Sequence, residues 1–189
     1  MYPFARAFGG EKESQLKISR EAFAAMKAGL EAGSVIVFAP LVVRGGDKAW
    51  DPETARHEVA TLQRILLPKA ALASQTPEVP FEPMGANQLR WVRDRGRLYA
   101  GWVGTTRPAG DYFFFTEVLT DGNGARILAA HLYVVDASGR LAYESLANSH
   151  HFDPGSFRDA GGMIDWVLER FKKDLQEEPT EIFPPYGVG

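Results

Sequence analysis

Three runs of sequence decide the fold: Asp111-Tyr-Phe-Phe-Phe-Thr-Glu-Val-Leu119, Arg126-Ile-Leu-Ala-Ala-His-Leu-Tyr-Val-Val-Asp136 and Arg140-Leu-Ala-Tyr-Glu-Ser-Leu-Ala-Asn-Ser-His-His151. Glycine-bearing turns at residues 121–124 and 136–139 separate them. Short runs rich in β-branched and aromatic residues, bounded by Gly, Asn, Asp and Ser, are typical of strands joined by hairpins. We therefore predict a three-stranded antiparallel meander over about residues 111–151, with Gly139 at a positive φ in the second turn.

The sequence before the meander predicts two helices and a buried strand. Ser19 is a suitable N-cap for the first helix, and Gly33 stands where a C′ glycine would end it. Residues 34–40 form a continuous apolar run, as in a strand buried on both faces, and residues 41–43 extend it beyond a bend. Asp51-Pro-Glu53 is the best helix start in the chain, because Asp caps, Pro suits the first position and Glu favours the positive helix end.

Helical spacing of apolar residues indicates the buried faces of the later helices. The helix that starts after Asp51 is predicted to bury Ala55, Val59, Leu62 and Leu66. A helix over 87–103 is predicted to bury Leu89, Val92, Tyr99 and Val103, although Gly96 and Gly101 weaken it. The most amphipathic helix, over 162–176, is predicted to bury Ile164, Val167, Leu168, Phe171 and Leu175. Residues 70–73 fit a short strand or a loop equally, and the proline-bearing stretch 74–85 fits a loop.

The order of these elements predicts an α+β fold. A mostly antiparallel sheet contains the meander, and the helices pack on it. We divide the chain into an extended N-terminal arm (1–18), a single α+β domain (19–177) and a Pro- and Gly-rich C-terminal tail (178–189).

The composition argues against several classes of function. The 189 residues carry a net charge of −3 and contain no cysteine, which excludes disulfides, thiolate metal sites and cysteine nucleophiles. The acidic balance gives no global attraction to nucleic acid or to anionic membranes. No run approaches the roughly 18 apolar residues of a membrane span. We expect a soluble chain, cytoplasmic or, if a leader has been removed, periplasmic, with neither a cofactor nor a metal ion.

Five polar residues of the meander region are the candidate ligand-binding residues: Glu117, His131, His150, His151 and Asp153. The last three form the cluster that most resembles a metal or acid–base site, but polar residues leaving a hairpin explain it equally well. Neighbouring strand residues point to opposite faces, so both histidines can bind one ion only if the strand has already ended. His131, in mid-strand, fits a hydrogen-bonded core or interface histidine better than a catalytic one. Glu117 lies among aromatic residues, where its pKa could be shifted; the simpler interpretation is that it faces outward, with no second carboxylate poised beside it.

Two further stretches have a functional and a structural interpretation. Arg90-Trp-Val-Arg-Asp-Arg-Gly-Arg97 interleaves basic residues with an aromatic one, as do surfaces that neutralise phosphates and stack bases. On a predicted helix of an acidic protein, a solvated helix face is the better interpretation, so we do not expect a nucleic-acid partner. The aromatic residues 112–115 fit a core beneath the helices, and on an uncovered face they would form an apolar patch for a partner.

Three motifs carry a resemblance to known proteins: Val35-Ile-Val-Phe-Ala-Pro40, Ala109-Gly-Asp-Tyr-Phe-Phe-Phe115 and Val134-Val-Asp-Ala-Ser-Gly-Arg-Leu141. With a helix after the first motif, the order of elements over residues 20–175 resembles the small α/β domains of TolB amino-terminal regions and of curli-secretion-type outer-membrane lipoproteins. The third motif is similar to their hairpin between the last two strands. The chain departs from the lipoproteins in having no cysteine for lipid attachment. The resemblance implies a non-catalytic binding or assembly domain of the bacterial cell envelope, and it carries over no catalytic residue.

We therefore expect a non-enzymatic domain that binds a protein partner or self-associates. The missing catalytic signature and the aromatic-rich strands motivate this expectation. The alternative is a small-ligand-binding protein or an enzyme with a polar pocket on the meander. That alternative predicts that four side chains converge on one cavity: His131, His150, His151 and Glu117.

Overall fold

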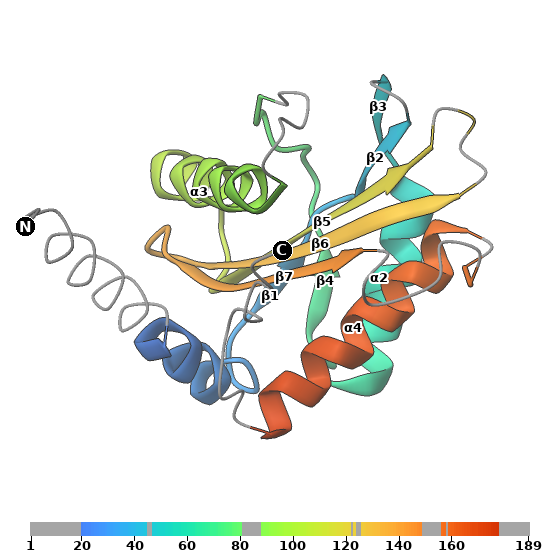
Figure 1. The fold of residues 1–189 in the computed structure, drawn as a ribbon. Coiled ribbons are helices and arrows are strands. Elements are labelled where there is room, and N and C mark those ends of the chain that lie inside the picture. Colours follow the sequence, from blue (N-terminus) through green and yellow to red (C-terminus); the bar gives the residue numbers. More distant parts are fainter. Residues whose placement is uncertain are drawn as a thin grey trace, which may run out of the picture.

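The structure, a computed structural model, describes residues 20–44, 47–80, 88–121, 123, 126–148, 156–157 and 159–177. Along the chain it contains a helix that includes residues 20–29, then β1 (Val35–Val37), β2 (Leu41–Arg44), β3 (Asp47–Trp50), α2 (Pro52–Ile65), β4 (Ala70–Leu72), α3 (Gln88–Thr106), β5 (Tyr112–Thr120), β6 (Ile127–Asp136), β7 (Leu141–Asn148) and α4 (Ala160–Glu177). One mixed sheet lies between two layers of helices, with α3 on one face and α2 and α4 on the other (Figure 1). The predicted α+β class is confirmed.

The strand β5 organises the sheet, because it pairs along both of its edges. On one edge β1 and β2 follow each other, both parallel to β5, with Val35 opposite Tyr112 and Leu41 opposite Glu117. On the other edge β6 pairs antiparallel with β5, and β7 pairs antiparallel with β6. The predicted meander is therefore present, and its antiparallel pairings are the longest in the sheet. The short strands β4 and β3 pair with β1 and β2.

The second turn of the meander is built by Asp136 and Gly139. One carboxylate oxygen of Asp136 accepts hydrogen bonds from the backbone N–H groups of Ser138 and Arg140, at 2.9 and 3.0 Å. Gly139 has a φ of 78°, as predicted from the turn sequence. A Cβ at this position would lie 2.8 Å from the Cα of Gly104 and 2.9 Å from the carbonyl oxygen of Ala100. The turn therefore touches the backbone of α3, and only glycine allows that approach.

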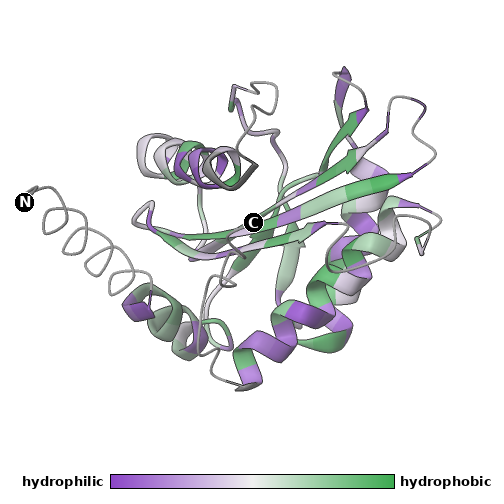
Figure 2. Cartoon of the chain, viewed as in Figure 1, coloured by the Kyte–Doolittle hydropathy of each residue, from purple (hydrophilic) through white to green (hydrophobic). Residues whose placement is uncertain are grey.

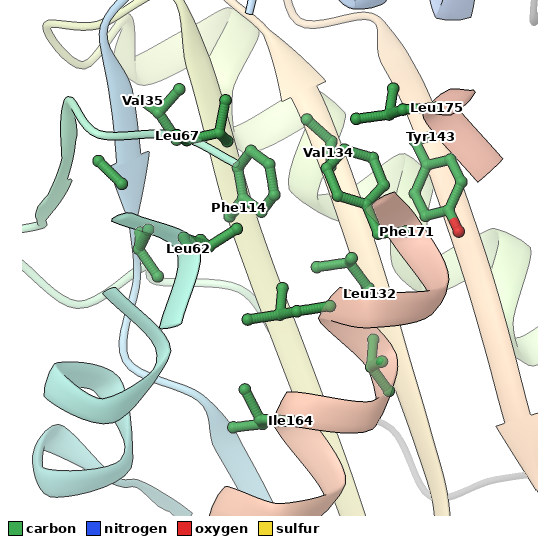
Figure 3. Packing of buried hydrophobic residues seen from close by; sticks show 14 of the residues in the cluster. Val35, Leu62, Leu67, Phe114, Leu132, Val134, Tyr143, Ile164, Phe171 and Leu175 are labelled. Atoms are coloured by element: carbon green, nitrogen blue, oxygen red, sulfur yellow. The ribbon is translucent and has the colours of Figure 1, made fainter. Parts of the chain in front are cut away.

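The alternation of β5 divides its aromatic side chains between two cores. Phe114 packs with apolar residues of α2 and α4, whereas Phe113 and Phe115 pack under α3. In Figure 3, Phe114 and Leu132 from the sheet point toward Phe171 from α4. Figure 2 shows hydrophilic and hydrophobic residues side by side on α4, as expected for a helix with one buried face. The three phenylalanines are at most 1% exposed, so the prediction that they form a core beneath helices is confirmed.

Several predicted boundaries agree with the structure and others do not. Asp51 caps α2 through its side chain, and residues 70–72 form a strand. On α2, Glu58 and Thr61 are buried, while the predicted core residue Val59 is only partly buried. The strand β3 was not predicted, and the first helix ends before Gly33, at residue 29. None of the helices in the described ranges is long and apolar enough to cross a membrane. The predicted arm and tail lie outside the described residues, and the division into arm, domain and tail stays a prediction.

Substitution of two glycines tests the approach of the turn to α3. Gly139→Ala should lower the free energy of unfolding by about 2–4 kcal/mol, because alanine is strained at a positive φ and its Cβ would press on the backbone of α3. Gly101→Ala, in the exposed interior of α3, should raise it by about 0.5–1 kcal/mol, since alanine favours helix and its Cβ meets nothing within 4 Å. Urea denaturation measures both, and a neutral Gly139→Ala would contradict the close contact.

Candidate functional site

The meander brings four polar side chains to the face of the sheet under α3. Glu117 on β5 lies opposite His131 on β6, and Tyr133 on β6 lies opposite Glu144 on β7. Because side chains alternate along a strand, the two β6 residues point to the same face. All four side chains are buried.

Arg95 of α3 forms a buried ion pair with Glu117. Its Nε and Nη2 atoms donate to Glu117 Oε1 at 2.7 and 2.5 Å, and its Nη1 atom donates to the carbonyl oxygen of Pro80. The hydroxyl of Tyr99, one helical turn further along α3, donates to the same Glu117 oxygen at 2.7 Å. The side chains of Arg95 and Glu117 are 2% and 0% exposed. This pair therefore ties α3 to the centre of the sheet without contact to solvent.

The surroundings of Glu117 keep it ionised. Burial by itself raises the pKa of a carboxyl group, but the hydrogen bond from His131 and the charge of Arg95 hold the pKa of Glu117 below its ordinary value. Burial, followed by the charge of Glu117, raises the pKa of Tyr99 well above its ordinary value, so Tyr99 stays a hydrogen-bond donor. A carboxylate that is held ionised by these neighbours is a poor general base, because its proton affinity has been lowered.

His131 lies beside the same carboxylate and keeps one nitrogen without a partner. Its Nδ1 atom is 3.3 Å from Glu117 Oε2, and the ring packs edge-on against Trp91 at 5.5 Å. An ionised carboxylate only accepts hydrogen bonds, so Nδ1 carries a proton. In the part of the chain that the structure describes, Nε2 of His131 and the hydroxyl of Tyr133 are buried atoms with no hydrogen-bond partner. Neither of these two side chains has solvent exposure.

Glu144 is the second carboxyl group on this face. Burial raises the pKa of Glu144 to about 7, although the positive charges of Arg93 and Arg97 on α3 lower it in part. The helix lies close to it because residue 96 is glycine: a Cβ there would be 3.3 Å from Glu144 Oε2 and 2.9 Å from Leu141 Cδ2. Gly96 weakened the prediction of this helix. The close approach of the helix to β7 at this position is the physical reason for a glycine here.

Two polar groups lie on the other side of the sheet, around α2. Glu58 is fully buried, and its Oε1 atom accepts a hydrogen bond of 2.6 Å from Thr116. Burial raises the pKa of Glu58 to about 8. Nearer the surface, Asp165 of α4 accepts a hydrogen bond of 2.7 Å from Thr61 and lies 2.9 Å from Nε2 of His57. Across the described segments, no group of three or more His, Cys, Asp or Glu side chains could hold a metal ion.

The predicted site residues meet different outcomes. Glu117 and His131 are brought together, and His131 is a hydrogen-bonded core histidine as predicted. The prediction that Glu117 faces outward was wrong, because α3 covers that face and supplies a cation for it. A second carboxyl group, Glu144, also lies on that face, although none was expected there. The remaining predicted residues lie outside the described ones: His150, His151 and Asp153.

Sequence reasoning missed the α3 contribution to the site. The interpretation of residues 90–97 as a solvated helix face was wrong for Arg95, which is buried, and right for Arg97, whose side chain is 67% exposed. The signal was present in the spacing: Arg95 is three residues after Val92 and four before Tyr99, on the predicted buried stripe. A charged residue on that stripe indicates a buried partner.

Breaking the ion pair should destabilise the fold strongly. Arg95→Met should lower the free energy of unfolding by about 3–5 kcal/mol, because it leaves Glu117 as an uncompensated buried charge. Adding Glu117→Gln should recover part of the loss, since glutamine still accepts from Tyr99 and carries no charge. Denaturation of the single and double variants measures the coupling, with Arg97→Met as the exposed control on the same helix, expected within about 0.5 kcal/mol of the parent. A cost of Arg95→Met no larger than that of the control would contradict the assignment.

The raised pKa of Glu58 predicts a loss of stability as the pH rises. Between the ordinary pKa of 4.5 and the folded pKa of about 8, the folded chain holds a proton on Glu58 that the unfolded chain has released. The free energy of unfolding should therefore fall across this window and level off above pH 8. Glu58→Gln should remove this contribution, whereas Glu144→Gln should change only the part below about pH 7. Identical slopes between pH 7 and 8 in the parent and in Glu58→Gln would show that Glu58 is not held protonated.

Comparison with known proteins adds no relative: no protein-family model and no curated protein sequence matches the chain. The function must therefore be argued from the geometry of this chain. Of its buried polar groups, Arg95, Tyr99 and Glu117 hold α3 against the meander, whereas Glu58 and Thr116 join α2 to the other face of the sheet.

Proposed function

We propose that the protein is a non-enzymatic binding domain that holds a partner protein along the edge of β7. The strand pairing of β7 carries the proposal. Within the described ranges β7 pairs with β6 alone, over Leu141–Asn148, while α3 and α4 cover its two faces. Strand addition to a sheet edge is a recurring mode of protein recognition. Residues 142–147 are buried in the free chain, so a partner strand would have to open this edge in order to pair with β7.

The sequence of β7 lacks the features that usually block an edge strand. It contains neither lysine nor proline, and its single charged residue, Glu144, is turned inward and buried. A register shift beside Val135 disturbs the pairing at the start of the strand, which leaves residues 143–148 regular. The opposite edge differs, because β4 and β3 are only three and four residues long and β3 carries Asp47 and Lys48. Short and charged edges resist further pairing.

The resemblance to envelope domains stays a prediction, and it points to the same class of function. The observed order of β1, a later helix α2, and then α3, the meander and α4 supports it, with β2 and β3 standing between β1 and α2. The alternative of a small-ligand site or an enzyme also stays a prediction. The meeting of His131 with Glu117 speaks for that alternative, while the complete burial of both side chains and the lowered pKa of Glu117 speak against it.

Hydrogen exchange of the free protein tests whether the edge is open. In an edge strand, alternate amides are bonded to the neighbouring strand and the others face outward. The amides of residues 143–147 that do not pair with β6 should therefore exchange faster than the amides of β6, although their burial keeps them slower than the unfolded rate. Nuclear magnetic resonance resolves the two sets. Uniform protection of β7 at every protein concentration would mean that the chain covers its own edge, and it would remove the proposal.

A further inference from the structure

We propose that a proton on Glu144 controls the opening of the β7 edge: the protonated side chain keeps the edge closed, and its ionisation lets the edge open. This control rests on the proposed function, because a partner strand can pair with β7 only after residues 142–147 leave their buried positions. It adds the condition under which the strand becomes able to bind.

Glu144 lies in the middle of β7, at the contact between the strand and α3. It is the single charged residue of the strand, and it is 7% exposed. The helix backbone comes close because residue 96 is glycine, where a Cβ would lie 3.3 Å from Glu144 Oε2. On the other side, Tyr133 of β6 lies opposite Glu144 in the sheet. The carboxyl group is therefore enclosed by helix and sheet, and its full hydration requires that this contact opens.

The two carboxyl groups under α3 differ in their hydrogen bonds. Glu117 accepts hydrogen bonds from Arg95 and Tyr99, and its second oxygen lies 3.3 Å from His131. Within the described ranges, burial and the charges of two arginines act on Glu144, without a hydrogen bond to its carboxyl group. A buried carboxylate that lacks hydrogen-bond donors is unfavourable, whereas the protonated group carries no net charge. The closed contact therefore favours the protonated side chain.

The charges that face Glu144 offset the effect of burial only in part. Burial raises the pKa of Glu144 to about 7, although the positive charges of Arg93 and Arg97 lower it. Arg97 also pairs with Asp94 at 3.2 Å, and Arg93 has a further interaction, so neither arginine serves Glu144 alone. On the β6 side, burial raises the pKa of Tyr133 well above its ordinary value, so its hydroxyl carries no charge.

The direction of the pH dependence follows from the two environments of Glu144. In the opened strand the side chain is hydrated and titrates near its ordinary pKa of 4.5, whereas in the closed contact its pKa is about 7. Between these values the closed form holds a proton that the opened form has released. Opening should therefore become easier as the pH rises across this window, and it should level off above about pH 7.

Hydrogen exchange at two pH values tests this control on the full chain. The rate of each amide is divided by the rate of an unfolded chain at the same pH, because the chemical exchange itself accelerates with pH. Between about pH 5.5 and about pH 7.5, the protection of residues 143–147 should fall about tenfold. Glu144→Gln, and the apolar Glu144→Met as a second variant, should keep the protection constant. Glu58→Gln is the matched control, because it removes a buried carboxyl group on the other face of the sheet and should leave the tenfold fall in place.

A short extended peptide of alternating valine and threonine is the probe for the partner strand, since it is uncharged in its side chains at both pH values. It should bind to β7 about tenfold more tightly at the higher pH, because a larger fraction of the chain is then open. The Glu144→Gln variant should bind it equally weakly at both pH values.

The other outcomes separate this control from the proposed function. Peptide binding that is equal at both pH values, or a fall in protection that persists in Glu144→Gln, would overturn the control and leave the proposed function standing. Loss of the fall in Glu58→Gln would show that β7 opens only when the whole chain unfolds, and it would overturn the control as well. Absence of peptide binding at both pH values, with β7 still opening through Glu144, would remove the proposed function and with it the role of this control.

Discussion

Because successive side chains of β5 point to opposite faces and helices cover both faces, one step along its sequence moves a side chain from one core of the molecule to the other. Thr116 points toward α2 and donates a hydrogen bond to Glu58, whereas Glu117 points toward α3 and accepts hydrogen bonds from Arg95. Every polar contact at the centre of the sheet depends on this alternation and on the register of β5 with β6. A shift by one residue would place the carboxylate of Glu117 against the apolar residues of α4 and leave Arg95 buried without a carboxylate beside it.

The ion pair of Arg95 with Glu117 determines where α3 lies on the sheet, and its net contribution to the stability of the fold is smaller. Burying two charges costs desolvation free energy that their attraction offsets only with good geometry. Here the geometry is good, since Tyr99 and the carbonyl of Pro80 also take part. An apolar pair could hold the helix as strongly, but it would tolerate sliding. The ion pair, the close approach at Gly96 and the contact at Gly139 together fix one register of the helix on the meander.

Local chemistry predicted the parts of the fold that depend on a few neighbouring residues. The Asp51 cap, the positive φ of Gly139 and the buried face of α4 follow from short patterns, and the structure has all three. The environment of Glu117 could not be predicted from alternation, because a period of two separates the faces of a strand without indicating which helix covers each face. Its partner Arg95 is 22 residues away on another element, and only its place on an apolar helical stripe indicated burial.

Within the described ranges, β7 is the strand of the meander that pairs on one side only, with β6. Its residues from Ala142 to Ala147 are nevertheless at most 7% exposed, backbone included, with α3 on one face and α4 on the other. Pairing of a partner strand with β7 would therefore have to open a buried edge. The buried ion pair of Arg95 with Glu117 fixes α3 over one face of β7, so such pairing has to take place at the edge of the strand and not on that face.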